Sequence, residues 1–192
     1  MAKINFERRE AICQIVYYGP AMSGKTASLQ TLHARCPAEK KTELTSINTT
    51  GDRTLYFDYF ALDLGQIAGL KTRFSLYTVP GQVKYNQTRK YVLTGVDGVI
   101  FVADSQEDKL EENVESLDNL AENLLDMNTK LVDIPLVFQW NKRDLPNILP
   151  VEALEEKLNP RHLSSFETIA QTGQNIFPAL KECTRKVLEK IR

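Results

Sequence analysis

The stretch GPAMSGKT, residues 19–26, constrains the fold of this chain more than any other feature of the sequence. It matches the pattern G-x-x-x-x-G-K-[ST], follows an apolar run and opens a helical pattern. Small and turn-forming residues let backbone N–H groups curl around phosphate oxygens, and the N-terminus of the next helix adds the positive end of its dipole. The stretch therefore predicts a phosphate-binding loop, or P-loop, between a strand and a helix. The alternative is an ordinary glycine-rich turn.

Apolar runs and helical patterns alternate along the rest of the chain. Strands are predicted at 11–19, 54–64, 70–79, 98–105, 134–142 and 166–170, and helices at 25–36, 110–124, 151–158 and 177–191. The runs 54–64 and 70–79 flank GQIAG, which favours a hairpin. This alternation indicates the α/β class, with a mostly parallel central sheet, one antiparallel edge strand and helices on both faces. We expect residues 1–192 to form a single domain.

Composition and charge exclude several classes of partner. The formal net charge is −1, which gives no bulk attraction to nucleic acid or to an anionic membrane. The three cysteines include no Cys-x-x-Cys pair, as expected of a reduced cytosolic chain. The sequence shows no signal peptide, no membrane-spanning run and no lipidation motif. We therefore expect a cytoplasmic protein with no stable membrane anchor and no nucleic-acid partner.

The P-loop pattern assigns a role to each part of its segment. Lys25 would reach the β- and γ-phosphates of a nucleotide, and the Thr26 hydroxyl would bind Mg²⁺. The backbone N–H groups around them would surround the phosphates. The residues that we expect to touch the nucleotide here are Gly19, Ala21, Met22, Ser23, Gly24, Lys25, Thr26 and Ala27.

Two later stretches are suited to recognise a base. In NKRD, which begins at Asn141, the carboxylate of Asp144 can accept two hydrogen bonds from guanine, whereas adenine presents no such pair of donors. Lys142 would lie along the base, and the Asn141 amide would tie this loop to the P-loop. In IAQTG, residues 169–173, the N–H of Ala170 would meet the guanine carbonyl oxygen. Either stretch alone could be a solvated turn, but the P-loop earlier in the chain favours a base-binding role for both.

These motifs, in this order, resemble those of Ras-like small GTPases. The closer resemblance is to the bacterial MglA group, which controls cell polarity and gliding motility. It is carried by five stretches that cover nearly the whole chain: QIVYYGP (14–20), DRTLYFDYF (52–60), KTRFSLYTVPGQ (71–82), GVDGVIFVADS (95–105) and NKRDLP (141–146). The resemblance implies the small-GTPase fold of P-loop NTPases, GTP/GDP and Mg²⁺ as cofactors, and a GTP-hydrolysing molecular switch.

The resemblance also implies partners. They are a roadblock-type, MglB-like dimer that activates hydrolysis and effectors that recognise the GTP state, with recruitment to a cell pole by such partners. On its own the chain is expected to be a monomer.

The resemblance places switch I at GDRTLYFD, residues 51–58. Thr54 would be the second protein ligand of Mg²⁺ and would contact it only when the γ-phosphate is present. Arg53 would stabilise charge on the transferring phosphoryl group from within the same chain, a role worth about 10³–10⁵ in rate. The alternative is a solvated arginine at a strand edge. Together with Gln82 and Lys25, Arg53 completes the expected catalytic set.

Switch II is expected at QVKYNQTRKY, residues 82–91. Gln82 would orient the attacking water, and the N–H of Gly81 would contact the γ-phosphate. The cationic residues of the segment (Lys84, Arg89 and Lys90) are expected to be solvated or to face a partner rather than to act in catalysis.

One position departs from the usual Asp-x-x-Gly-Gln pattern, because Thr78 stands where small GTPases have an aspartate that helps to hold Mg²⁺. In the MglA group threonine is the usual residue at this position. If the hairpin turns near Ala68, facing positions sum to about 136 and Asp58 lies opposite Thr78. Asp58, helped by the Thr78 hydroxyl, could then bind a Mg²⁺-coordinated water. The alternatives are that Asp58 is a surface acid, or that Asp104 takes this role.

A second departure is Ala21, where Ras-like and MglA-like chains usually have glycine. Its methyl group would lie against the γ-phosphate and crowd Gln82 or Arg53. We therefore expect GTP hydrolysis that is slow without an activating partner. Ala21 and Thr78 also keep an alternative open, a slow or non-hydrolysing GTP-binding scaffold. A P-loop kinase is a third class, against which the guanine-reading loop argues.

Overall fold

The structure is a computed structural model that describes residues 3–5, 7, 9–48, 56–67 and 69–191. Its strands are β1 (Lys3–Asn5), β2 (Glu10–Tyr18), β3 (Thr45–Asn48), β4 (Tyr56–Ile67), β5 (Leu70–Thr78), β6 (Gly98–Asp104), β7 (Leu136–Asn141) and β8 (Ser165–Glu167). Its α-helices are α1 (Lys25–Arg35), α2 (Asn86–Leu93), α3 (Leu110–Leu125), α4 (Val151–Leu158) and α5 (Ile176–Ile191). Short 3-10 helices are η1 (Ala38–Lys40), η2 (Val83–Tyr85), η3 (Glu107–Lys109) and η4 (Leu131–Asp133).

The strands form one sheet in the order β3-β4-β5-β2-β6-β7-β8, and β1 pairs with β2 outside this path. The pairs from β5 through β2, β6 and β7 to β8 are parallel. Strand β4 runs antiparallel to both β5 and β3. The predicted α/β fold, with a mostly parallel sheet and an antiparallel hairpin strand, is confirmed. One detail differs from the expectation, because β3 lies outside β4 and takes the edge.

The pairing of β4 with β5 places Asp58 beside Thr78. The backbone N–H of Asp58 donates a hydrogen bond to Thr78 Oγ1 at 3.0 Å, so the facing partner predicted from the hairpin is present. Toward the tip, the register shifts between Asp63 and Gln66, which marks a β-bulge. Gly65 lies in this bulge with φ of 76°, a conformation that favours glycine. The bulge inserts one additional residue into β4 and so helps to set which residues face each other farther along the pair.

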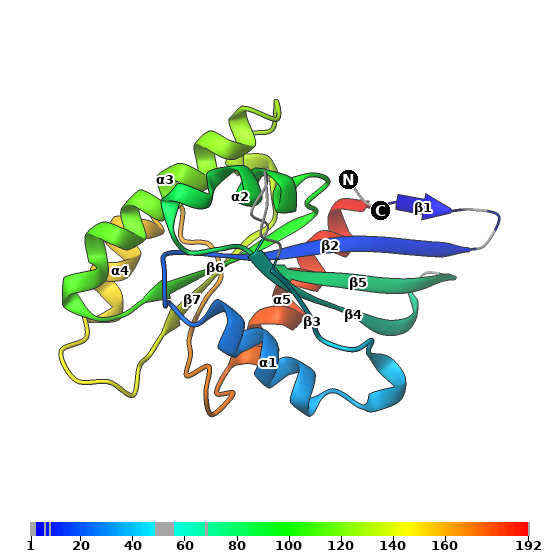
Figure 1. The fold of residues 1–192 in the computed structure, drawn as a ribbon, viewed down its shortest axis with the longest axis horizontal. Coiled ribbons are helices and arrows are strands. Elements are labelled where there is room, and N and C mark those ends of the chain that lie inside the picture. Colours follow the sequence, from blue (N-terminus) through cyan, green and yellow to red (C-terminus); the bar gives the residue numbers. More distant parts are fainter. Residues whose placement is uncertain (1–2, 6, 8, 49–55, 68, 192) are drawn as a thin grey trace.

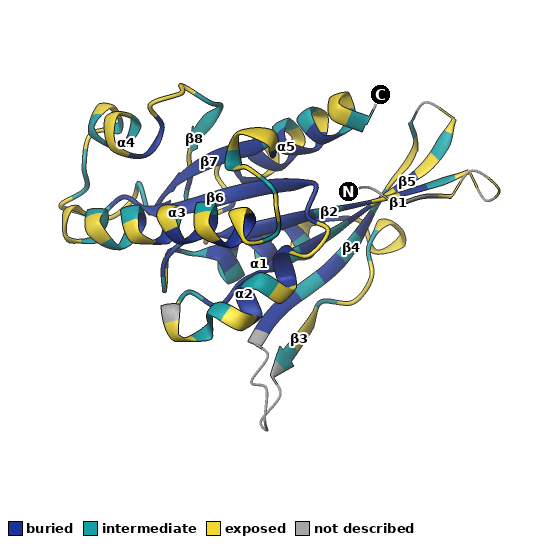
Figure 2. Cartoon of the chain, turned by 90° about the horizontal axis from the view of Figure 1, so that it is seen from above, coloured by how far each residue is buried: buried dark blue, intermediate teal, exposed yellow. Residues whose placement is uncertain are grey.

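Helices cover the sheet on both faces, as expected. Helices α1 and α5 lie on one face, and α2, α3 and α4 lie on the other (Figure 1). Along β2 the side chains alternate between these layers: Ile15 and Tyr17 belong to the core under α1 and α5, while Val16 and Tyr18 belong to the opposite core. Strands β6 and β7 are buried along their whole length (Figure 2). Coverage on both faces explains their continuous apolar sequence.

Apart from the short 3-10 helices, three described elements were not predicted from the sequence: β1, β3 and α2. The strands β1 and β3 have only three and four residues and lie at the margins of the sheet. Helix α2 spans eight residues within the segment that was interpreted only as switch II. Its apolar residues are too few and too closely grouped to give a helical period.

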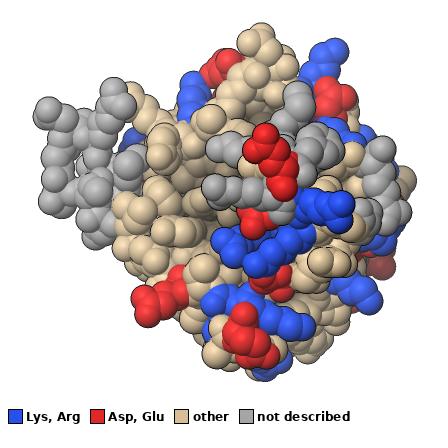
Figure 3. Space-filling model, turned by 90° about the vertical axis from the view of Figure 1, so that its right-hand side faces the viewer, with Lys and Arg blue, Asp and Glu red and all other residues tan. Residues whose placement is uncertain are grey.

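The end of the molecule that carries β1 and the C-terminus of α5 exposes basic and acidic side chains next to one another (Figure 3). This face is therefore mixed in charge, in keeping with the net charge of −1. Among the described residues, no helix has the length and apolar character that crossing a membrane requires.

Candidate nucleotide-binding site

The carboxyl ends of four neighbouring strands meet at one edge of the sheet. Strand β2 leads into the P-loop, β5 ends at Thr78, β6 ends at Asp104 and β7 ends at Asn141. Helix α1 begins at this same edge (Figure 1). Parallel α/β sheets place their ligand sites at such an edge, and here it brings together segments that are far apart in the sequence.

Two glycines give the P-loop its path. Gly19 has φ of 141°, and a Cβ at this position would lie 2.2 Å from the carbonyl oxygen of Val102. Gly24 has φ of 106°, and a Cβ there would lie 2.1 Å from the side-chain nitrogen of Asn141. Both positions therefore require glycine for backbone conformation and for space. Met22 also has a positive φ, 58°, and its side chain is exposed.

Lys25 is buried inside the P-loop. Its Nζ donates hydrogen bonds to the carbonyl oxygens of Gly19, at 3.0 Å, and Pro20, at 2.5 Å. Burial lowers the pKa of Lys25 to about 7, and the nearby positive charge of Arg89 adds to this shift. A cation held next to backbone carbonyls at a glycine-rich loop is placed to bind an anion, which would raise the pKa again.

Asn141 joins three loops. Its Nδ2 donates to the carbonyl oxygen of Ser23 at 2.7 Å, which ties the NKRD loop to the P-loop as the sequence predicts. Its Oδ1 accepts from the backbone N–H of Ala170 at 3.0 Å and from Thr168 Oγ1 at 3.2 Å. The N–H of Ala170, which was expected to face guanine, therefore donates to Asn141 in this structure. Thr31 of α1 completes the junction by donating to the carbonyl oxygen of Ala170 at 2.7 Å.

The remaining NKRD residues lie at the rim of this junction. Lys142 has φ of 67°, and its Nζ lies 2.5 Å from Asp104 Oδ2. Asp104 is buried and is paired with this cation, so its carboxylate holds Lys142 in place. This contact argues against Asp104 as the acid that serves Mg²⁺. Asp144 is exposed at the surface, where a base could approach it.

Asp58 is buried and forms hydrogen bonds with hydroxyl groups from three segments. Thr26 Oγ1 donates to Asp58 Oδ2 at 2.8 Å, and Thr78 Oγ1 donates to the same oxygen at 3.2 Å. Ser46 Oγ donates to Oδ1 at 2.6 Å. The interpretation of Asp58 as an exposed surface acid is wrong, since only 5% of the residue is exposed. Its carboxylate lies against the hydroxyl that the P-loop pattern assigns to Mg²⁺.

The start of switch II packs directly on the P-loop. A Cβ at Gly81 would lie 2.3 Å from Ala21 Cα and 2.6 Å from its backbone nitrogen. A side chain at position 81 would therefore collide with the backbone of Ala21. Gln82 is exposed and faces the same cavity as the P-loop.

Arg89 does not lie where the sequence suggested. It was expected to be solvated or to face a partner, but it is fully buried. Its Nε donates to the carbonyl oxygen of Pro80 at 2.9 Å, and its terminal nitrogens donate to the carbonyl oxygen of Gly81 at 2.6 Å and to Asn119 Oδ1 at 2.5 Å. The expectation failed because arginine is usually exposed, and sequence alone does not show which backbone carbonyls will lie within its reach. Lys84, by contrast, is exposed.

A cavity of about 640 Å³ lies where these parts meet. It is lined by the P-loop residues Ala21, Met22, Gly24, Lys25, Thr26 and Ala27, by residues 78–82 and by Tyr85. It thus joins predicted phosphate-binding, Mg²⁺-binding and switch positions in one space. Arg53 and Thr54, the two switch I candidates, lie outside the residues that the structure describes.

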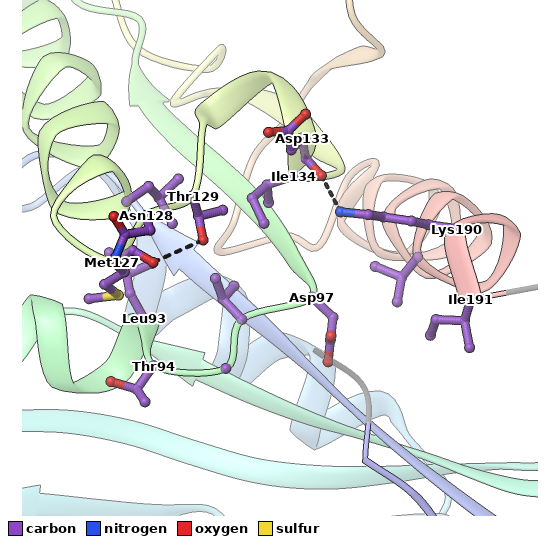
Figure 4. Close-up of a pocket in the computed structure, with 14 residues that line it drawn as sticks. Leu93, Thr94, Asp97, Met127, Asn128, Thr129, Asp133, Ile134, Lys190 and Ile191 are labelled. Atoms are coloured by element: carbon purple, nitrogen blue, oxygen red, sulfur yellow. Dashed lines mark hydrogen bonds between the residues drawn. The ribbon is translucent and has the colours of Figure 1, made fainter.

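Another cavity, of about 740 Å³, lies between the ends of α2, α3 and α5 (Figure 4). Its wall includes Leu93, Met127 and Ile134, and Lys190 at its rim donates to the backbone carbonyl of Asp133. None of the P-loop or NKRD residues lines it. The larger hollow is therefore separate from the candidate nucleotide site.

Comparison with known proteins decides the family. A sequence model of the ADP-ribosylation factor family matches residues 2–190. The chain belongs to this family. Within it, the chain is 50% identical to the "Mutual gliding-motility protein MglA" of Myxococcus xanthus (strain DK1622), over 192 residues that make up 100% of this chain and 98% of that protein. The predicted resemblance to MglA-type small GTPases is confirmed. Membership of a small-GTPase family supports guanine-nucleotide binding and GTP hydrolysis in general, and ADP-ribosylation factor relatives typically use Mg²⁺.

The residues at this edge of the sheet fit Mg²⁺ as cofactor and a guanine nucleotide as substrate. The P-loop can supply N–H groups and Lys25 to phosphates, and Thr26 with Asp58 can supply a hydroxyl and a carboxylate to hydrated Mg²⁺. Among the described residues, no three His, Cys, Asp or Glu side chains cluster to hold a metal alone.

Proposed function

We propose that this chain is a GTP-hydrolysing molecular switch that regulates cell polarity or motility, formed by residues 1–192 as one small-GTPase domain. The observation that carries the proposal is the Asn141 side chain, which joins the NKRD loop to the P-loop through the carbonyl oxygen of Ser23 at 2.7 Å. This bond fixes the spacing between the residues suited to guanine and those suited to phosphate. A guanosine nucleotide needs both at once.

The phosphate end of the proposed site is served by four residues. Lys25 would leave the carbonyls that it contacts and bind the β- and γ-phosphate oxygens. The N–H of Gly81 would donate to the γ-phosphate, and Gln82 would orient the attacking water. Arg53 would offset the negative charge that develops on the transferring group. Charge stabilisation and positioning supply most of the rate in phosphoryl transfer.

When bound, Mg²⁺ would neutralise phosphate charge. Thr26 and Thr54 are its proposed protein ligands. Asp58 would serve in place of the usual aspartate by accepting hydrogen bonds from water on the ion, and the Thr78 hydroxyl, which donates to Asp58 Oδ2 at 3.2 Å, would keep that carboxylate in place. Such outer contacts suit Mg²⁺, which retains several of its waters.

The base end of the site would select guanine. The exposed carboxylate of Asp144 would accept the two guanine donors, and the Lys142 stem would lie along the ring. The N–H of Ala170 reaches the guanine carbonyl only if its bond to Asn141 Oδ1, 3.0 Å in this structure, is shared or released.

The decisive experiment measures phosphate release over time with GTP and, separately, with ATP, each in the presence of Mg²⁺. We expect release from GTP only, and Asp144→Ala should remove the preference while the exposed-acid control Asp108→Ala keeps it. Equal release from both nucleotides would contradict guanine selection. Tight GTP binding without release, even with an activating partner, would instead support the scaffold alternative.

Ala21 sets the expected rate of the isolated protein. Gly81, next to Gln82, packs on the Ala21 backbone, so the Ala21 methyl stands beside the groups that must move to accommodate water. Ala21→Gly should raise the single-turnover rate of GTP hydrolysis by about tenfold, because small misplacements of reacting groups are costly. Ala38→Gly, an exposed position outside the candidate site, is the control and should change little. No acceleration in Ala21→Gly would reject the crowding explanation.

The proposed partners follow the family. A roadblock-type, MglB-like dimer would activate hydrolysis near the switches, and effectors would bind the GTP state and recruit the protein to a cell pole. The isolated chain is proposed to be a monomer. Sedimentation of the chain alone and with such a dimer, in GDP and in a GTP analogue, tests both points.

A further inference from the structure

Arg89 on α2 is a buried cation with neutral partners. None of the ion pairs recorded among the described residues includes it. Its guanidinium contacts two backbone carbonyls and the Asn119 side chain, and it lies 5.2 Å from the centre of the Tyr18 ring. A buried charge without a counter-charge is costly. This cost favours the binding of an anion near the guanidinium.

The position of Arg89 indicates where that anion binds. Its two carbonyl partners belong to Pro80 and to Gly81, and Gly81 is the residue that packs against Ala21 of the P-loop. A nucleotide phosphate bound at the P-loop, next to Ala21, would therefore lie within the field of Arg89. GTP brings more negative charge to this place than GDP does.

The contacts of Arg89 also orient a peptide group. The C=O of Pro80 and the N–H of Gly81 belong to one trans peptide, so they point in opposite directions. By holding the Pro80 oxygen at 2.9 Å, Arg89 turns the Gly81 N–H away from itself. Gly81 packs on Ala21 on its other side. That N–H is the group expected to contact the γ-phosphate.

Helix α3 anchors this arrangement. Asn119 Oδ1 accepts from Arg89 at 2.5 Å and from the Tyr18 hydroxyl at 2.7 Å. Asn123, one turn later, donates to Asn119 Oδ1 and to the Tyr18 hydroxyl, each at 3.1 Å. The guanidinium is thus held by a buried network that reaches from α3 to the end of β2, directly before the P-loop.

We propose that Arg89 is a positioning residue that makes the site distinguish GTP from GDP, by orienting the Gly81 N–H and by placing a buried positive charge near the γ-phosphate. The inference rests on the proposed function and names a determinant within it. Arg89 would act through Gly81 and would not touch the reacting atoms.

The test measures equilibrium affinity for GDP and for the non-hydrolysable analogue GMPPNP, both with Mg²⁺, by competition against fluorescently labelled GDP. Arg89→Met should weaken GMPPNP binding by about tenfold to a hundredfold relative to GDP, as expected for lost bonds to a charged group. GDP affinity should change by less than about threefold. Arg89→Lys keeps the charge but cannot bridge both carbonyls, so it should recover part of the preference.

Lys90→Met is the matched control, because Lys90 is the adjacent cation on the same helix and pairs with Asp126 at the exposed surface. It should bind both nucleotides as the unmodified protein does. If Arg89→Met does not unfold cooperatively, Arg89→Lys and Asn119→Ala replace it, since Asn119→Ala leaves the cation but removes its anchor. Both should lower the GMPPNP preference.

Three results would overturn the proposal. An unchanged GMPPNP-to-GDP ratio in the Arg89 variants would show that Arg89 does not discriminate. An equal loss of affinity for both nucleotides would show a merely structural role. A stronger preference for GMPPNP would show that Arg89 opposes binding of the γ-phosphate. If the unmodified protein binds neither nucleotide, the proposed function fails as well, an outcome distinct from the other three.

Discussion

At the scale of single residues, we propose that the acid of the candidate Mg²⁺ site lies on a different strand from the usual one. Thr78 occupies the position where small GTPases usually have aspartate, and Asp58 on β4 brings a carboxylate to 2.8 Å from Thr26 Oγ1. The change of strand has a structural consequence. On this proposal the acid is the last residue of the predicted switch I and lies on β4, so its position depends on how β4 pairs with β5.

Removing the Asp58 carboxylate should weaken Mg²⁺ binding without destroying the phosphate loop. In Asp58→Ala, the Mg²⁺ concentration that half-maximally retains bound GTP should rise about tenfold, since outer partners of metal sites typically contribute this much. Retention at saturating Mg²⁺ should return close to normal. The dissociation rate of labelled nucleotide, measured across a Mg²⁺ titration, gives the answer.

Asp63→Ala is the control for Asp58→Ala. Asp63 lies on the same strand, and its carboxylate is 3.8 Å from Lys71 at the surface. Its variant should show the normal Mg²⁺ dependence. An Asp58→Ala titration that matches this control would exclude Asp58 from the metal site.

Lys25 predicts a pH dependence of nucleotide binding. Burial, with help from Arg89, lowers its pKa from 10.5 to about 7. Phosphates favour the charged amine, so above pH 7 binding must take up a proton, and affinity should fall as pH rises. The folding stability measured without nucleotide has the opposite dependence on pH. Between about pH 7 and 10.5 the unfolded chain binds more protons, so stability rises with pH in that window.

Calorimetry at pH 8 in buffers of different ionisation enthalpy measures this proton uptake directly. The uptake should be close to one proton in the unmodified protein and in the exposed control Lys40→Gln, and it should be lost in Lys25→Met. GDP binding at pH 8 that takes up no proton would contradict a lowered pKa for Lys25.

At the scale of elements, the long buried strands and the motifs at their ends were predictable, because each strand is covered on both faces and is therefore continuously apolar. The β4–β5 hairpin was predicted in part. Counting from a turn near Ala68 placed Asp58 opposite Thr78, and the hydrogen bond between them confirms it. The count did not include the bulge between Asp63 and Gln66, since an additional residue in a strand leaves no periodic signal.

The short marginal strands and α2 could not be predicted in the same way. Strands β1 and β3 form because a longer neighbour offers an open edge, which is a property of the assembled sheet. Arg89 shows the same limit at the site. Its burial depends on the carbonyls of Pro80 and Gly81 and on Asn119 from α3, groups that come together only after folding.

At the scale of the whole molecule, helix α5 closes one face of the sheet by very close packing at Gly98. A Cβ at Gly98 would lie 2.6 Å from Val187 Cγ2 and 3.0 Å from Cys183 Sγ. Gly98→Ala should therefore destabilise the protein by about 1–3 kcal/mol through overpacking. Urea unfolding followed by the fluorescence of the single, buried Trp140 measures this change.

The double variant Gly98→Ala with Val187→Ala separates overpacking from other effects of the added methyl group. Removing the Val187 methyls makes room, so the double variant should be less destabilised than the sum of the two single variants. Simple additivity would show that the added methyl does not collide with α5.

The P-loop and the start of switch II touch through backbone atoms, because Gly81 lies against Ala21. A displacement of either backbone should therefore displace the other. A partner that shifts the backbone at Gly81 should change how long the P-loop retains GDP and GTP alike, and nucleotide release measured with and without such a partner would report this coupling.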